Sequence, residues 1–236
     1  MSASISAQPA VDAEAIAACL ESVRDRIEAA SARAGRDWRE VTLIAVSKGQ
    51  PVEAILAAAA CGVTDFGENR VQEALAKLEQ LGGSAEAAEV RIHLIGHLQT
   101  NKVRDAMGRF AVVQTIDSER LLRAISAHAA APVACMLQVN VASDPAKYGF
   151  APEATRDMVA LARSLPGISL VGLMTVPQRA DDPEAVRPHF AALRELAAAN
   201  NLPGLSMGMT EDFEVAIEEG ATHVRVGRAI FGERQV

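Results

Sequence analysis

The fold of this chain is decided by residues 41–70, which read VTLIAVSKGQPVEAILAAAACGVTDFGENR. The run at 41–47 is continuously apolar and β-branched, as a strand buried on both faces should be. Pro51 then begins a helix with apolar residues along one face, Gly62 ends it, and a second short strand follows at 63–67. A strand, a helix and a second strand in about 30 residues predict a βαβ unit in a parallel sheet.

The same alternation continues along the rest of the chain. Helical periodicity separates each predicted strand from the next, and the remaining strands are expected at 91–96, 111–116, 132–141, 168–174, 205–209 and 222–227. Eight strands alternating with helices predict the α/β class and a single closed (β/α)8 barrel of the TIM type. An open, doubly wound sheet is the alternative that this pattern leaves open.

An extra helix precedes the first strand. Apolar residues recur at helical spacing from Ile16 to Ile27, with Asp12 as the expected N-cap. Residues 1–10 are rich in Ser, Ala and Pro, and we expect them to be disordered. Because no linker interrupts the alternation, 11–236 is predicted to be one barrel domain with this N-terminal helix.

Composition excludes several classes of protein. The chain of 236 residues carries a net charge of −7 and only 3% aromatic residues, which does not suit a nucleic-acid-binding protein. There is no apolar stretch of the length needed to span a membrane and no secretory signal pattern. The three cysteines form no CxxC pair, which is typical of a reducing compartment. We therefore expect a cytoplasmic protein, and with no sign of an obligate interface we expect a monomer.

Lys48 is the first residue that indicates chemistry. In a barrel the loops after the strands gather at one mouth, which is where active sites form. Lys48 directly follows the buried strand at 41–47, so its amine is expected at that mouth. Desolvation there favours a neutral amine, which can attack an aldehyde to give a Schiff base. A lysine that simply extends from the strand end to solvent is the alternative.

The loops after the seventh and eighth strands indicate a phosphate site. They read SMGMT at 206–210 and VGRAIFG at 226–232, and barrels often bind phosphate at these two loops. Gly208 and Gly227 let backbone N–H groups approach an anion, and Ser206 adds a hydroxyl donor. Glycines that only make tight turns are the alternative.

The residues next to these glycines are predicted to begin or cap the neighbouring helices. Arg228 begins the final helix, and Thr210 is expected to cap the preceding one. Glu211 and Asp212 are acidic and close to the expected phosphate, so we predict that they complement the helix dipole and face away.

Arg225 lies on the eighth strand between Val224 and Val226, and it takes the opposite face from both. If that face is the barrel interior, the buried guanidinium needs an acceptor. A pyridine nitrogen of a ligand would serve. An ion pair with Asp65 or Glu68 is the alternative.

Other polar residues carry weaker signals. His93 and His97 are four residues apart on a strand and its loop, but no third ligand joins them and no metal site is predicted. His97 is expected to form hydrogen bonds at the mouth. Asn69 is expected either near a ligand or as the cap of the second helix. Lys147 and Tyr148, on the loop after the fifth strand, are expected either to contact a ligand or partner or to be solvated.

Together these residues resemble the pyridoxal-phosphate homeostasis protein family, also described as similar to the N-terminal domain of alanine racemase. The resemblance extends over most of the chain after residue 40. It rests on LIAVSKGQP (43–51), FGENRVQE (66–73), HLIGHLQTNK (93–102), DPAKYGF (144–150), LVGLMTV (170–176), LSMGMTEDFEVAIEEG (205–220) and VRVGRAIFGER (224–234).

The resemblance implies a single barrel that binds pyridoxal 5′-phosphate (PLP) as a Schiff base. No residue is implied to be catalytic. The implied cofactor contacts are Lys48 for the Schiff base, Ser206, Gly227 and Arg228 for the phosphate, Arg225 for the pyridine nitrogen, and Asn69 and Met174 for the pocket wall.

The resemblance also implies a function in intracellular PLP (vitamin B6) homeostasis rather than an enzyme with an assigned turnover. The expected partners are PLP and PLP-dependent apo-enzymes. An arginine at the ring nitrogen cannot give up a proton, which makes the ring a poor electron sink. Tyr148, the only tyrosine, lies on a loop that does not match the second base of a racemase, and we expect no further domain after Val236. A PLP-dependent amino-acid racemase, and a PLP-free barrel for another phosphorylated metabolite, are the alternatives.

Overall fold

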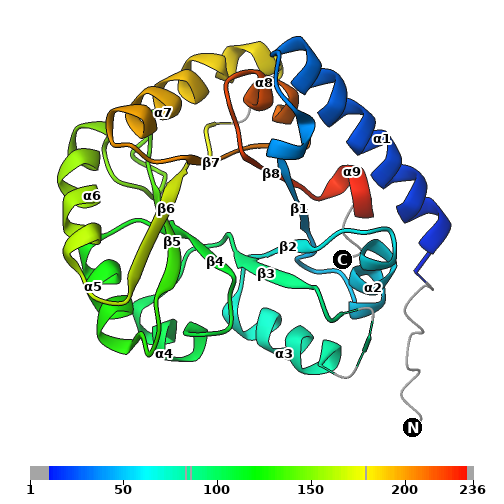
Figure 1. Ribbon diagram of the computed structural model, residues 1–236, viewed down its shortest axis with the longest axis horizontal. Helices are drawn as coiled ribbons and strands as arrows, with labels where there is room; N and C mark the ends of the chain where they lie inside the picture. Colours follow the sequence, from blue (N-terminus) through cyan, green and yellow to red (C-terminus); the bar gives the residue numbers. More distant parts are fainter. Residues whose placement is uncertain (1–10, 83, 86, 179, 233–236) are drawn as a thin grey trace, which may run out of the picture.

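The computed structural model describes residues 11–82, 84–85, 87–178 and 180–232. Its strands form one closed barrel in which each strand pairs in parallel with its sequence neighbours and the eighth pairs with the first (Figure 1). The barrel prediction is therefore confirmed, and the open sheet is excluded. The predicted disorder of residues 1–10 lies outside the described residues.

The strands follow the predicted order, and most are shorter than predicted by one to four residues. Their bounds are β1 Thr42–Val46, β2 Asp65–Glu68, β3 Arg91–Leu94, β4 Val112–Ile116, β5 Val133–Gln138, β6 Ile168–Met174, β7 Gly204–Met209 and β8 His223–Val226.

The helices surround the barrel, and short 3-10 turns (η) precede several of them (Figure 1). Their bounds are α1 Ala13–Arg33, η1 Trp38–Glu40, α2 Val52–Ala60, α3 Val71–Leu81, η2 Thr100–Lys102, α4 Val103–Ala106, α5 Glu119–His128, η3 Pro152–Ala154, α6 Thr155–Ser164, η4 Pro183–Val186, α7 Arg187–Ala199, α8 Phe213–Glu218 and α9 Arg228–Phe231.

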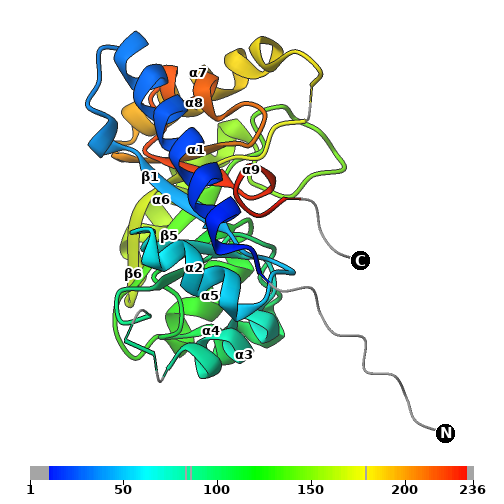
Figure 2. The ribbon, with the colours of Figure 1, turned by 90° about the vertical axis from the view of Figure 1, so that its right-hand side faces the viewer.

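The N-terminal helix α1 is part of the outer ring. Asp12 caps it by accepting a hydrogen bond from the N–H of Ala15 at 3.0 Å, as predicted. Its apolar face packs into the core, and it lies on the outside of the barrel against α2, α8 and α9 (Figure 2). Arg26 and Arg33 add ion pairs of 2.7 Å to Glu214 and Glu218 of the short helix α8. The extra helix is therefore held against α8 by packing and by ion pairs.

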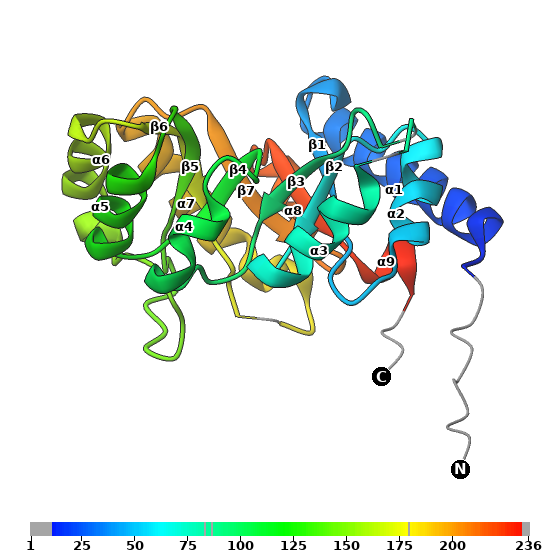
Figure 3. The same ribbon diagram turned by 90° about the horizontal axis from the view of Figure 1, so that it is seen from below.

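The barrel has two cores of different character. Between strands and helices the side chains are apolar, including Ala45, Phe66 and Val224. The barrel interior instead holds buried polar groups, among them His93 and Arg225. Alternation along each strand assigns one set of residues to each core. The polar interior leads to the mouth, and the segments after β5 and β6 project on the same side of the barrel as α9, the lower side of Figure 3.

No helix in the described part of the chain is both long enough and apolar enough to cross a membrane.

Candidate functional site

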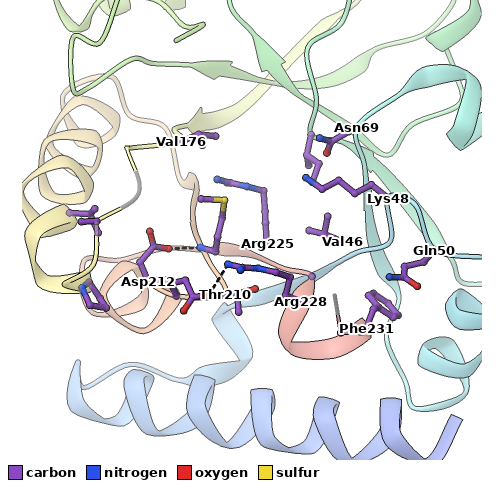
Figure 4. Close-up of a pocket in the computed structure, with 18 residues that line it drawn as sticks. Val46, Lys48, Gln50, Asn69, Val176, Thr210, Asp212, Arg225, Arg228 and Phe231 are labelled. Carbon is purple, nitrogen blue, oxygen red and sulfur yellow. Dashed lines mark hydrogen bonds and ion pairs between the residues drawn. The ribbon is translucent and has the colours of Figure 1, made fainter. Parts of the chain in front are cut away.

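A cavity of about 520 Å³ opens at the carboxyl ends of the strands (Figure 4). This size is typical of small-molecule sites. The lining comes from the ends of β1, β2, β3, β7 and β8, from the segment after β6 and from α9. It consists of Val46, Lys48, Gln50, Asn69, Ile95, Val176, Ala180, Pro183, Val186, Met209, Thr210, Glu211, Asp212, Arg225, Gly227, Arg228, Phe231 and Gly232.

Lys48 lies where the sequence predicted it, half-buried at the end of β1. Its side chain extends into the cavity opposite Thr210 and Asp212 in Figure 4. Gly49 has a φ of 72°, so the chain turns sharply after the lysine in a conformation that favours glycine. This turn directs the chain away while the amine stays in the cavity.

A buried ionic cluster holds the backbone on both sides of Lys48. The Lys77 ammonium donates to the Ser47 carbonyl at 2.7 Å, to Glu68 at 2.7 Å and to Glu73 at 2.8 Å. Glu73 in turn accepts from the Gly49 N–H at 2.6 Å. We call Ser47, Glu68, Glu73 and Lys77 the Lys77 cluster. It fixes the carbonyl before Lys48 and the amide after it, so the position from which the amine enters the cavity is set.

The two carboxylates of the Lys77 cluster have opposite pKa shifts. Burial raises the pKa of Glu68, because it outweighs the hydrogen bonds from Lys77 and Ser47. Burial also opposes ionisation of Glu73, but the hydrogen bonds from Lys77 and from the Gly49 N–H outweigh it and lower its pKa. Sequence reasoning missed this cluster, because Glu73 and Lys77 have the i, i+4 spacing of an ordinary surface pair.

Arg225 reaches the cavity from the barrel interior and is only 3% exposed. Its guanidinium donates to the Ser206 hydroxyl at 2.6 Å and to the Thr175 carbonyl at 2.8 Å. Burial lowers its pKa to about 10, partly offset by Asp212, so it remains a cation at neutral pH. The alternative of an ion pair with Asp65 or Glu68 is wrong.

Asp65 and Glu68, the alternative partners considered for Arg225, form hydrogen bonds and ion pairs with other residues. Asp65 accepts hydrogen bonds from Arg91 at 2.6 Å and from His93 at 2.8 Å. Glu68 belongs to the Lys77 cluster.

Two predicted contact residues lie beneath the cavity rather than in its wall. Ser206 is fully buried, and its hydroxyl donates to Gln114 at 2.7 Å while accepting from Arg225. Met174 pairs in register with Ser206 and is 1% exposed. Within the described residues neither is part of the cavity lining. Close packing also requires glycine at position 208, because a Cβ there would lie 2.6 Å from Ala216 Cβ of α8.

Thr210 lines the cavity and does not cap a helix, which corrects its predicted role. Asp212 is the N-cap residue of α8, and its side chain accepts instead from the Met209 N–H at 2.6 Å. Glu211 and Asp212 do not face away, since both line the cavity. The turn that places Thr210 in the cavity wall includes Gly208, whose φ of 89° favours glycine.

Gly227 and Arg228 are in the lining, as predicted. The Arg228 guanidinium pairs with Glu211 at 2.7 Å, and each side chain is 49% exposed. A Cβ on Gly227 would lie 3.3 Å from both the Cβ and the carbonyl oxygen of Val46. Glycine therefore keeps this corner of the cavity open.

Of the remaining predicted residues, one lies in the cavity and the others lie outside its lining. Asn69 points into the cavity and does not cap α3, whose N-cap is Arg70 (Figure 4). His97 lies in a separate polar depression, where it hydrogen-bonds Asp117 at 2.7 Å and stacks on Tyr148 with ring centroids 4.3 Å apart. Lys147 donates to the Val176 carbonyl at 3.0 Å, and burial lowers its pKa. Among the described residues no cluster could hold a metal ion.

The arrangement combines one primary amine with two guanidinium groups around a single cavity. An amine can condense with an aldehyde, and guanidinium groups and hydroxyls bind anions. The site is therefore suited to an aldehyde that carries a negatively charged group.

Comparison with known proteins agrees with this chemistry. Residues 18–235 match the family model of the alanine racemase N-terminal domain. A pyridoxal phosphate homeostasis protein of Aquifex aeolicus is 41% identical over 227 residues, covering 92% of this chain and 97% of its own. That of Escherichia coli K12 is 37% identical over 233 residues, covering 93% and 97%.

A solved structure extends the comparison to three dimensions. PipY of Synechococcus elongatus PCC7942, solved with PLP bound, has a TM-score of 0.78 and 35% identity. The match covers 92% of this chain and all of that one. The chain therefore belongs to the pyridoxal phosphate homeostasis protein family, whose barrel is that of the alanine racemase N-terminal domain.

Proposed function

We propose that this protein binds PLP reversibly through Lys48 and serves as a carrier that buffers the free cofactor. The observation that carries the proposal is that Lys48, Arg225 and Arg228 line one cavity. PLP supplies an aldehyde that condenses with a primary amine and releases water, and the reaction is reversible by hydrolysis. The Lys77 cluster holds the lysine in place for this reaction.

The positions of the lining residues indicate where the phosphate and the ring of PLP would lie. Thr210, Gly227 and Arg228 form the end that would hold the phosphate, with a hydroxyl, backbone N–H groups and a guanidinium as donors. Arg225 would face the ring nitrogen, and Asn69 would contact the ring from the side of Lys48. Thr210 would take the phosphate role that was predicted for Ser206, whose hydroxyl is hydrogen-bonded to Gln114 and Arg225 inside the barrel.

The same residues argue against turnover. A ring that faces the Arg225 cation is not protonated at its nitrogen and stabilises a carbanion poorly. Tyr148, the only tyrosine, is 61% exposed and stacks on His97 outside the cavity. It is therefore not placed as a second base. Steady production of D-alanine from L-alanine, lost in Lys48→Ala, would overturn the carrier role in favour of a racemase.

Equilibrium titration tests the proposal. The purified protein is titrated with PLP and with pyridoxal, which lacks the phosphate, while the visible absorbance of the Schiff base is recorded. We expect saturable binding of PLP and about 100-fold weaker binding of pyridoxal, since two or more charge-assisted hydrogen bonds are lost. No absorbance change with PLP, together with binding of a phosphorylated sugar, would favour the PLP-free barrel.

The Glu211–Arg228 pair gives a prediction of its own. Glu211 holds the guanidinium that the phosphate would need and places a negative charge beside that site. An exposed pair contributes about 0.2–1 kcal/mol, so Glu211→Gln should tighten PLP binding by up to about fivefold. Glu153→Gln, an equal change of charge on the exposed turn η3, serves as the control. Unchanged or weaker binding in Glu211→Gln would place the phosphate elsewhere.

A further inference from the structure

A continuous chain of buried side chains crosses the barrel interior from Arg225 to Asp65. Arg225 Nη1 lies 2.6 Å from Ser206 Oγ, which lies 2.7 Å from Gln114 Oε1. Gln114 Nε2 lies 3.0 Å from His93 Nδ1, and His93 Nε2 lies 2.8 Å from Asp65 Oδ1. These five residues, the interior chain, are at most 5% exposed.

The two ends of the interior chain, together with the requirement that every buried proton has an acceptor, fix the direction of each hydrogen bond in it. Arg225 can only donate. Asp65 can only accept, because hydrogen bonds from His93, Arg91 and Thr64 outweigh its burial and hold its pKa well below the usual range. Ser206 therefore accepts from Arg225 and gives its one proton to Gln114 Oε1.

The remaining two bonds then follow. The Gln114 amide must turn its nitrogen toward His93, so His93 Nδ1 accepts and carries no proton. His93 Nε2–H then donates to Asp65. With a cationic His93 the amide would have to reverse, and the Ser206 oxygen would face two donors with no acceptor for its own proton within the interior chain. The neutral Nε2–H form of His93 is the one that satisfies all five groups.

We propose that Gln114 and His93 are positioning residues for Arg225, which they hold in the orientation that faces the ring nitrogen of the bound cofactor. This inference rests on the proposed function. In the described part of the chain, neither residue is among those that line the cavity. Gln114 acts by keeping the Ser206 proton directed away from Arg225, so that a lone pair of the Ser206 oxygen always faces the guanidinium.

Loss of Gln114 would release one of the two groups that orient the Arg225 guanidinium. Its Nη1 and Nη2 groups are held by Ser206 and by the Thr175 carbonyl, which sets the plane of the guanidinium at the base of the cavity. If Gln114 is replaced by an apolar residue, the buried Ser206 hydroxyl loses its acceptor and can rotate its proton toward the guanidinium. That removes one of the two anchors of a buried cation.

The first test needs no cofactor. In 15N-labelled ligand-free protein, the ring nitrogens of His93 are identified among the five histidines as the signals lost in His93→Gln. We expect an unprotonated Nδ1 and a protonated Nε2. A protonated Nδ1, in either a neutral ring or an imidazolium, would overturn the assigned direction of the interior chain. Because this test does not involve PLP, its outcome is independent of the proposed function.

The second test separates positioning from general stability. Gln114→Leu should bind PLP about tenfold more weakly than the unmodified protein. Its affinity for the carbocyclic analogue of PLP, which has C–H in place of the ring nitrogen, should be unchanged. Thr115→Val is the control, because Thr115 is equally buried on β4 and donates to the Gly96 carbonyl at 2.7 Å, outside the interior chain.

Equal losses for PLP and for the carbocyclic analogue in Gln114→Leu would overturn the positioning role while leaving PLP binding itself intact. Absence of PLP binding in the unmodified protein would overturn the proposed function instead. If Gln114→Leu does not fold, the histidine tautomer in the unmodified protein decides whether the interior chain has the assigned direction.

Discussion

Lys48→Ala is expected to abolish the covalent PLP adduct and to weaken retention of PLP on dialysis by at least about 100-fold. Alanine removes the amine that enters the cavity from β1 and leaves in place the cavity residues proposed to bind the phosphate. The variant should therefore still bind PLP weakly and without the Schiff-base absorbance. The measurement is the visible spectrum after PLP loading and dialysis.

Lys147→Ala is the matched control for this experiment. Lys147 is another lysine near the cavity, since its ammonium contacts the Val176 carbonyl and Val176 lines the cavity. Burial lowers the pKa of Lys147, which makes it the competing nucleophile. We expect the control to keep its colour. Retained absorbance in Lys48→Ala together with its loss in Lys147→Ala would transfer the role to Lys147.

Lys77→Met is expected to destabilise the folded protein by about 3–5 kcal/mol at pH 8, because it leaves Glu68 buried without its cationic partner. Lys77 and Glu68 side chains are 8% and 0% exposed. One oxygen of Glu68 already lacks a hydrogen bond among the described residues. The measurement is the free energy of unfolding from urea denaturation, with Lys102→Met as the control for the same change in side chain.

The loss in free energy of unfolding caused by Lys77→Met should become smaller as the pH falls. Burial already raises the pKa of Glu68, and removal of Lys77 raises it further. Between its unfolded and folded pKa values Glu68 then binds more protons in the folded state, so stability decreases as the pH rises through that window and is regained on acidification. A cost that is the same at pH 5 and pH 8 would show that Glu68 does not depend on Lys77.

The fold could be predicted from the sequence because each strand and helix carries its own local signal. The apolar run of β1, Pro51 before α2 and Gly62 after it are enough to define one βα unit, and the pattern repeats around the barrel. The place of Lys48, Asn69, Gly227 and Arg228 at the cavity was predictable for the same reason, since each follows the end of a strand.

The rest of the site depends on contacts that no local pattern encodes. Thr210 precedes acidic residues and a helix, which is the pattern of an N-cap, but the turn at Gly208 places it in the cavity wall. Ser206 follows the alternation of β7 into the barrel interior. Lys77 is buried only because α3 packs across the ends of β1 and β2, so its role becomes apparent from the tertiary structure alone.

Borohydride reduction of the PLP-loaded protein, followed by peptide mass mapping, tests the central claim most directly. Reduction converts the reversible Schiff base into a stable secondary amine on whichever lysine formed it. We predict a single pyridoxyl-phosphate label on the peptide that contains Lys48. A label confined to Lys147 or Lys102, or a protein that remains unlabelled in excess PLP, would contradict the account.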